Sequence, residues 1–133
     1  MSNERALAAA LFVAAFFGAL LQLALNRDAA LGKGFETLAI ARSLAHNGTF
    51  ADPFLAAPTG PTAHLPPLYP FLLAILMRLL GDGPGFAIAA TVLNVVAQAL
   101  NAALLPAVSR RLLGDPRPGI YGAALSIALP VFQ

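Results

Sequence analysis

The sequence contains no cysteine and has few charged residues. The lack of cysteine excludes disulfide bonds and thiolate metal sites, and it leaves the redox compartment open. Only 11% of the 133 residues are charged while 59% are hydrophobic, a balance too apolar for an ordinary soluble domain. The net charge of +2 is too small and too dispersed to indicate a nucleic-acid partner. We therefore expect an all-α, polytopic helical membrane protein.

An uncharged run near the N-terminus is long enough to cross a lipid bilayer. Residues 6–25 read ALAAALFVAAFFGALLQLAL. As a helix they would extend about 30 Å, which matches the hydrocarbon core of a membrane. A cleaved signal peptide is the competing interpretation, but the run is long for one and no clear small-x-small cleavage site follows it. We predict an uncleaved transmembrane anchor.

Two more apolar runs lie in the second half of the chain. Residues 86–108 are long enough for a second transmembrane helix. A cluster of basic residues follows it directly: Arg110, Arg111 and Arg117. A third run begins at about residue 118 and is still apolar at Gln133. We expect residues 118–133 to be a truncated transmembrane helix and the chain to be the N-terminal part of a longer membrane domain, inactive by itself.

The apolar run at residues 68–80 decides the predicted topology. Its sequence, LYPFLLAILMRLL, would cover only about 20 Å as a helix, and such short runs are more often interfacial or re-entrant than spanning. If it does not span, a cytoplasmic N-terminus places the arginine cluster in the cytoplasm too, as the positive-inside tendency favours. Residues 26–85 are then one external loop. The inverted orientation stays open because Arg5 is the only N-terminal signal.

The predicted external loop contains an amphipathic helix near residues 34–47 and a proline-rich connector. Helical spacing places an apolar group on one side of this helix and Glu36, Ser43 and Asn47 on the other. The apolar group is Leu38, Ile40, Ala41, Leu44 and Ala45. The pair Asn47-Gly48 is a typical helix stop. Four prolines in GPTAHLPPLYP, residues 60–70, prevent a continuous helix and predict an ordered connector to the surface helix at 68–80.

Three stretches of this chain together resemble one known family. They are FETLAIARSLAHNGTFADPF, TGPTAHLPPLYPFLLAILMRLLG and SRRLLG. They are similar to the N-terminal part of bacterial C-type glycosyltransferases, of the dolichyl-phosphate-mannose protein mannosyltransferase-like and aminoarabinose-transferase-like kind. The resemblance covers most of the chain, and GPTA-x-x-PP-x-YP is its most specific part.

The resemblance implies an activity and a location. It implies a multi-pass protein of the bacterial inner membrane whose first external loop carries two juxtamembrane helices and an acidic catalytic residue. Such enzymes transfer a sugar from a polyprenyl-phosphate carrier to a protein, lipid or glycan acceptor at the outer face of the membrane. The implied partners are that donor, the acceptor and membrane lipids. No cofactor is expected, and a divalent metal requirement stays open.

The chemistry of this transfer requires a base. A positioned carboxylate can accept the proton of the attacking hydroxyl, which contributes about 10²–10⁴-fold to the rate. Many family members carry an Asp-Glu pair before the first juxtamembrane helix, and this sequence has no such pair. By the resemblance Glu36, in GFETLAIARSLA, is the first candidate and Asp28 the reserve. The alternative for Glu36 is a favourable charge at a helix start. Asp52, before Pro53, is expected to form a turn.

Four further residues are candidates for substrate binding: Arg42, His64, Pro67 and Tyr69. Arg42 is a candidate for the lipid phosphate, although a basic residue of an interfacial helix commonly faces headgroups. His64 is a candidate for a structural or substrate-contacting hydrogen bond rather than a metal ligand, because the other histidine, His46, lies far away in sequence. Pro67 belongs to the prolines expected to fix how the second surface helix enters the membrane interface.

A polar stripe runs along the predicted span at residues 86–108. Its members are Thr91, Asn94, Gln98 and Asn101. Their spacing places all of them on one helical face, where such residues avoid lipid and either bond neighbouring helices or line a polar cavity. Two rival classes remain. In a transporter or permease the stripe would belong to a substrate path, and a membrane scaffold would have no catalytic site.

Overall fold

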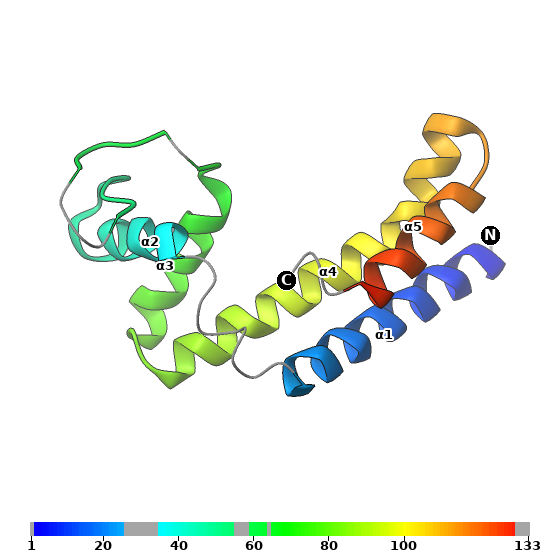
Figure 1. The fold of residues 1–133 in the computed structure, drawn as a ribbon, viewed down its shortest axis with the longest axis horizontal. Coiled ribbons are helices and arrows are strands. Elements are labelled where there is room, and N and C mark those ends of the chain that lie inside the picture. The colour runs from blue at the N-terminus through cyan, green and yellow to red at the C-terminus, as the bar shows by residue number, and fades with distance from the viewer. Residues whose placement is uncertain (1, 26–34, 55–58, 64, 130–133) are drawn as a thin grey trace. The chain divides into compact units, whose positions relative to one another are not determined.

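The computed structural model describes residues 2–25, 35–54, 59–63 and 65–129, and this part of the chain contains five helices (Figure 1). It has no strand there, only an isolated bridge between Ala51 and Pro61. The predicted all-α class is therefore confirmed for the described residues. The chain forms two compact units, one made of Met1–Arg27 with Leu93–Gln133 and the other of Asp28–Val92.

Two of the helices are long and apolar enough to cross a membrane. Helix α1 spans Ser2–Leu25 and helix α4 spans Pro84–Leu113. At about 1.5 Å per residue they extend about 36 and 45 Å, which is more than the hydrocarbon thickness of about 30 Å. Helix α3, Leu68–Leu80, is apolar but has only 13 residues. By length and composition, the described chain thus contains two candidate spanning helices and one short apolar helix.

The first unit packs α1, the C-terminal part of α4 and α5 (Arg117–Ala128) around small side chains. Its buried centre consists of Ala15, Ala99, Ala102 and Ala123. Small residues allow helix backbones to approach closely, which is the favoured packing where lipid offers no hydrophobic driving force. A close approach is at Gly119, where a Cβ atom would lie 2.3 Å from the backbone oxygen of Leu105. Helices α4 and α5 therefore meet there through their backbones.

Polar side chains also join the helices of the first unit. The Gln22 Nε2 atom on α1 donates to the backbone oxygen of Ile127 at 3.0 Å. The Gln98 Nε2 atom on α4 lies 3.5 Å from the oxygen of Ser126. Because α5 supplies both acceptors, its C-terminal end is tied to α1 and α4.

The second unit packs α2 (Phe35–Asn47) against α3 and the beginning of α4. The apolar side predicted for α2 faces this core, since Ile40 and Ala41 are fully buried. Helix α2 ends at Asn47, and Gly48 follows with φ of 70° and donates its N–H to Leu44. Ser43, which shares its side of α2 with Glu36 and Asn47, is buried. Its hydroxyl forms a hydrogen bond with that of Thr49 at 3.1 Å, so the buried polar group has a partner.

Candidate functional site

The first catalytic candidate, Glu36, lies in the first turn of α2 and is half-buried. An acidic side chain at this position interacts favourably with the helix dipole, which is typically worth about 0.3–1 kcal/mol. Helix stability alone is therefore a sufficient reason for an acid there. The reserve candidate, Asp28, lies outside the described residues, as does His64.

Arg42, the candidate for binding the lipid phosphate, forms an ion pair with Asp82. Its Nε atom lies 2.7 Å from Asp82 Oδ2, and its Nη2 atom lies 3.4 Å from Oδ1. This hydrogen bond lowers the pKa of Asp82 and raises the pKa of Arg42. A guanidinium has five N–H donors, so the pair leaves part of Arg42 available to an anion. Both side chains remain more than a third exposed, at 39% and 37%.

Arg78, on α3, caps the C-terminal end of α2. Its Nε atom donates to the backbone oxygen of Ala45 and its Nη2 atom to that of Leu44, both at 3.0 Å. The last carbonyls of a helix lack partners within the helix, and a cation there also favours the negative end of the helix dipole. Arg78 therefore joins α3 to α2. No local pattern in the sequence signals this contact, because the acceptors lie 33 and 34 residues away.

Asp52 holds the loop that follows α2. Its Oδ1 atom accepts hydrogen bonds from the backbone N–H groups of Thr59 and Gly60, both at 2.9 Å. Its own N–H donates to the oxygen of Gly60 at 3.1 Å. Asp52 also has φ of 56°, a conformation that aspartate tolerates better than most residues. This carboxylate therefore has a structural role that fits the turn expected at Asp52.

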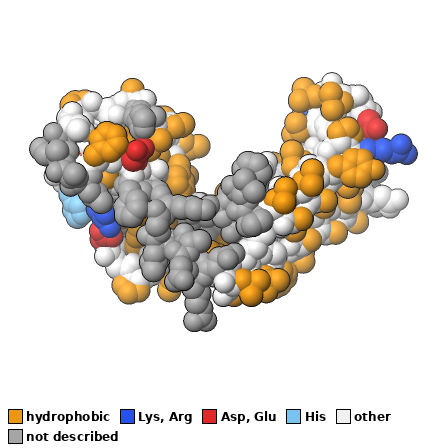
Figure 2. Space-filling view, in the orientation of Figure 1, with side chains coloured by type: hydrophobic (Ala, Val, Ile, Leu, Met, Phe, Trp, Pro, Cys, Tyr) orange, Lys and Arg blue, Asp and Glu red, His pale blue; other side chains and the backbone are white. Residues whose placement is uncertain are grey.

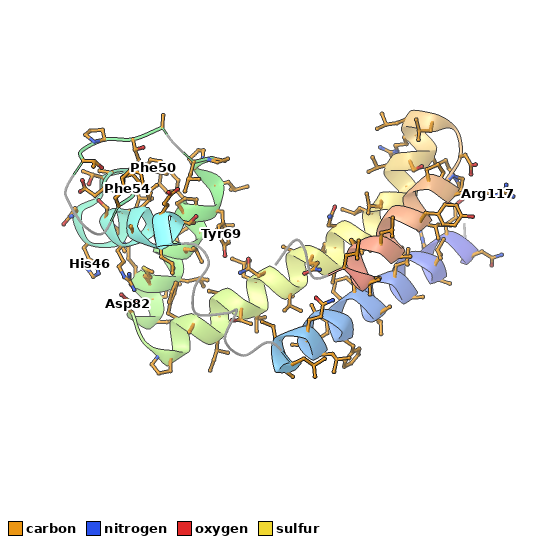
Figure 3. The ribbon with its side chains drawn as sticks, in the orientation of Figure 1. His46, Phe50, Phe54, Tyr69, Asp82 and Arg117 are labelled. Atoms are coloured by element: carbon orange, nitrogen blue, oxygen red, sulfur yellow. The ribbon has the colours of Figure 1, made fainter. Side chains whose placement is uncertain are left out.

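Pro67 and Tyr69 lie at the beginning of α3. Pro67 is the N-cap residue, and its carbonyl accepts the N–H of Phe71 at 3.1 Å. Tyr69 is exposed in the first turn. The ring of Phe71 lies 6.2 Å from that of Phe50, which brings the loop after α2 close to the start of α3 (Figure 3). The loop after α2 thus contacts α3 through an aromatic pair.

The structure places the described candidates, Glu36, Arg42, Pro67 and Tyr69, in one unit. Glu36 and Arg42 are six residues apart on α2, so their side chains leave the helix about 120° apart. Asp82 and His46 lie on the same side of the unit (Figure 3), and His46 contributes to the lowered pKa of Asp82. In the described part of the chain no three His, Cys, Asp or Glu residues form a group that could hold a metal ion.

The described surface carries few charges. Hydrophobic side chains cover much of what is visible of both units, and charged side chains occupy only a few places (Figure 2). Sequence reasoning missed Asp82, which neutralises the most promising cation of the site. Comparison with protein-family models, with curated proteins and with solved structures finds no match to this chain.

Proposed function

We propose that this chain is part of a membrane glycosyltransferase that moves a sugar from a polyprenyl-phosphate carrier to an acceptor at the outer face of a bacterial inner membrane. The best support is the position of the three stretches that resemble this family. Two of the three, residues 35–54 and 59–81, contribute to one compact unit. In sequence these two stretches lie between the two candidate spanning helices.

The outward side of α3 supports a position at the membrane surface. One side of α3 is buried in its unit. Along the other, four large apolar side chains are exposed at helical spacing: Leu68, Leu72, Ile75 and Leu79. Exposed apolar patches of this kind commonly mark lipid or partner contacts. Only three residues, 81–83, separate α3 from α4, so we place α3 in the interface where a lipid-linked sugar would be found.

The proposed orientation rests on a contact inside the first unit. Arg110, near the end of α4, forms an ion pair with Glu4, near the start of α1. The two helices therefore bring the arginine cluster to the same end of the unit as Arg5. The positive-inside tendency makes that end cytoplasmic, which puts residues 26–85 outside.

Accessibility of single cysteines tests this orientation. The chain has no cysteine of its own, and a Cβ at Gly83 would meet nothing within 4 Å. Thr59→Cys and Gly83→Cys should react with an impermeant thiol reagent in intact spheroplasts, whereas Asp115→Cys should react only after lysis. Labelling of Gly83→Cys only after lysis would mean that α3 crosses the membrane.

In the proposed reaction Glu36 acts as the base, with Asp28 in reserve. The acceptor hydroxyl loses its proton to the carboxylate as its oxygen forms a bond to the anomeric carbon of the sugar. The bond from that carbon to the phosphate oxygen breaks, and polyprenyl phosphate leaves with the electron pair. The leaving phosphate is already ionised, so nearby cations help more than a strong acid. The N–H donors of Arg42 not used by Asp82 fit this need. Pro67 and Tyr69 would shape the site where the lipid-linked sugar meets the acceptor.

The glycans and lipids of a strain lacking the gene test the function. We expect one envelope component to lose a sugar and the lipid-linked donor to accumulate, with both changes reversed by the restored gene. A transporter is the second candidate because of the polar stripe on α4. An unchanged envelope combined with lost uptake of a solute would favour the transporter, and an unchanged envelope with a dispersed membrane complex would favour a scaffold.

A further inference from the structure

Arg42, His46 and Asp82 form a small charged group on the second unit. Asp82 accepts the Nε hydrogen of Arg42 at 2.7 Å, while the contact from Nη2 to Oδ1 is longer, at 3.4 Å, and therefore weaker. His46 follows Arg42 by one helical turn, so both side chains leave α2 on the same side. The hydrogen bond from Arg42 lowers the pKa of Asp82, and the charge of His46, on the same side of the unit, adds to this effect (Figure 3). Two basic side chains of α2 thus share one anion, which belongs to the chain itself.

In the described chain, only Arg42 forms hydrogen bonds with the Asp82 carboxylate. Gly81 and Gly83 flank Asp82 in the turn between α3 and α4, and a Cβ at either glycine would meet nothing within 4 Å. Both partners of the ion pair are more than a third exposed, and such pairs change an equilibrium by a factor of about 2–5. The Asp82 side chain can therefore leave Arg42 with little loss of stability.

A lipid phosphate competes with Asp82 for the same guanidinium. Carboxylates and phosphates both accept hydrogen bonds from arginine, often two at once. Two anions on one guanidinium repel each other, so Asp82 weakens phosphate binding whether it stays beside the phosphate or is displaced by it. In the proposed transfer the donor phosphate carries one negative charge, and the released polyprenyl phosphate carries about 1.5–2 at pH 7. Without a competing anion, Arg42 would hold this product more tightly than it holds the donor.

We propose that Asp82 is a built-in competitor for the phosphate that Arg42 binds, and that it promotes the release of polyprenyl phosphate after sugar transfer. This role rests on the proposed function, in which Arg42 binds the lipid phosphate. Arg42 alternates between the phosphate and Asp82, which returns to it as the product leaves. The turn that carries Asp82 joins α3, which we place in the membrane interface, to the candidate spanning helix α4. The carboxylate therefore lies at a depth that lipid phosphates reach.

Binding of labelled polyprenyl phosphate to the complete protein in detergent tests this role. Asp82→Asn removes the charge and keeps the shape of the side chain. It should bind the lipid about 2–5-fold more tightly than the parent protein, and a chase with unlabelled lipid should release the label more slowly by a similar factor. Because the same substitution slightly lowers stability, a merely structural role of Asp82 predicts weaker binding instead. Unchanged or weaker binding by Asp82→Asn overturns the proposal.

Two controls show whether the effect acts through Arg42. Arg42→Gln should weaken binding by about tenfold or more, and in this background Asp82→Asn should change nothing. Asp52→Asn removes a carboxylate of the same unit that bonds to Thr59 and Gly60 rather than to Arg42, so binding should stay as in the parent protein. Tighter binding by Asp52→Asn, or an effect of Asp82→Asn that persists without Arg42, would assign the change to general charge and contradict the proposal.

Further arms of the same experiment identify the source of the phosphate and separate this role from the proposed function. Inorganic phosphate and phosphatidylglycerol should compete only weakly, since neither carries the prenyl chain. Competition by phosphatidylglycerol as strong as that by polyprenyl phosphate would assign the site to ordinary headgroups and contradict the release role. Binding by the parent protein with no change in Asp82→Asn contradicts only the role of Asp82. Absence of binding to the parent protein contradicts the proposed function as well.

Discussion

Arg42 and Asp82 form an ion pair across 40 residues of sequence, with Arg42 Nε 2.7 Å from Asp82 Oδ2. The pair ties α2 to the turn between α3 and α4. Arg78 ties α3 back to the end of α2 through two backbone oxygens. Two arginines from opposite helices therefore hold the α2–α3 pair together outside its apolar core.

The first prediction concerns the pH dependence of this ion pair. The pKa of Asp82 is lowered by its hydrogen bond from Arg42, so its contribution to stability is present above the unfolded-state pKa of about 3.9 and is lost as the pH falls through the lower native pKa. Both groups are partly exposed, so Asp82→Asn should cost only about 0.2–1 kcal/mol at pH 7. Unfolding in detergent, measured at several pH values, gives this difference directly.

The same measurement includes its control. Asp82→Asn in an Arg42→Gln background should cost less than in the parent protein, because the charge partner is already absent. The gap between the parent and Asp82→Asn should close as the pH drops below about 4. A gap that stays constant at low pH would show that Asp82 stabilises the unit by some means other than its charge.

The second prediction concerns the contact between α4 and α5. A Cβ at Gly119 would lie 2.3 Å from the oxygen of Leu105 and 2.7 Å from the Cα of Pro106, both backbone atoms that cannot move aside alone. Gly119→Ala should therefore lower stability by about 1–3 kcal/mol or more. Gly122→Ala is the matched control, because its Cβ would meet only the Leu105 Cδ1 atom at 3.7 Å. Both variants are compared by thermal unfolding. An equal loss of stability in Gly119→Ala and Gly122→Ala would contradict this contact.

Local patterns in the sequence predict the helices and their apolar sides well, but not the contacts between distant polar groups. The 3.6-residue period is enough to place Ile40 and Ala41 in the core. It cannot show that the Thr49 hydroxyl, beyond the end of α2, forms a hydrogen bond with that of Ser43. The partnership of Arg42 with Asp82 leaves no local pattern either, because it depends on how α2 and α3 pack.

The polar stripe on α4 is a second case in which sequence spacing does not identify hydrogen-bond partners. The spacing alone predicts that its four residues share a side, and it leaves their partners open. The structure divides the stripe, since Gln98 reaches α5 whereas Thr91 bonds to the Ala87 oxygen of its own helix. Asn94 and Asn101 stay exposed. The position of α5 decides the partner of Gln98, which the spacing alone cannot show.

The third prediction distinguishes the two possible roles of Glu36 by the size of the effect of Glu36→Gln on turnover. If Glu36 only favours the helix start, Glu36→Gln removes about 1 kcal/mol or less of stability and leaves turnover nearly intact. If it is the base, as we propose, the same change lowers turnover by about 10²-fold or more while expression and membrane insertion stay normal. Turnover is measured with the complete protein in nanodiscs.

The controls for Glu36 are the other carboxylates of the proposed loop. Asp52→Asn keeps a side-chain oxygen that can accept the hydrogen bonds from Thr59 and Gly60, so it should have little effect on turnover. Asp28→Asn removes the reserve candidate. Near-normal turnover of Glu36→Gln together with an inactive Asp28→Asn protein would move the base to Asp28.

The most direct measurement of the proposed function is sugar transfer by the complete protein, purified in nanodiscs, with a polyprenyl-phosphate sugar as the only donor. We predict that the lipid-linked sugar is consumed, that polyprenyl phosphate is released, and that the sugar appears on an acceptor from the cell envelope. Glu36→Gln protein prepared in the same way is the negative control. Transfer from a soluble nucleotide sugar in the absence of any lipid carrier would contradict the proposed function.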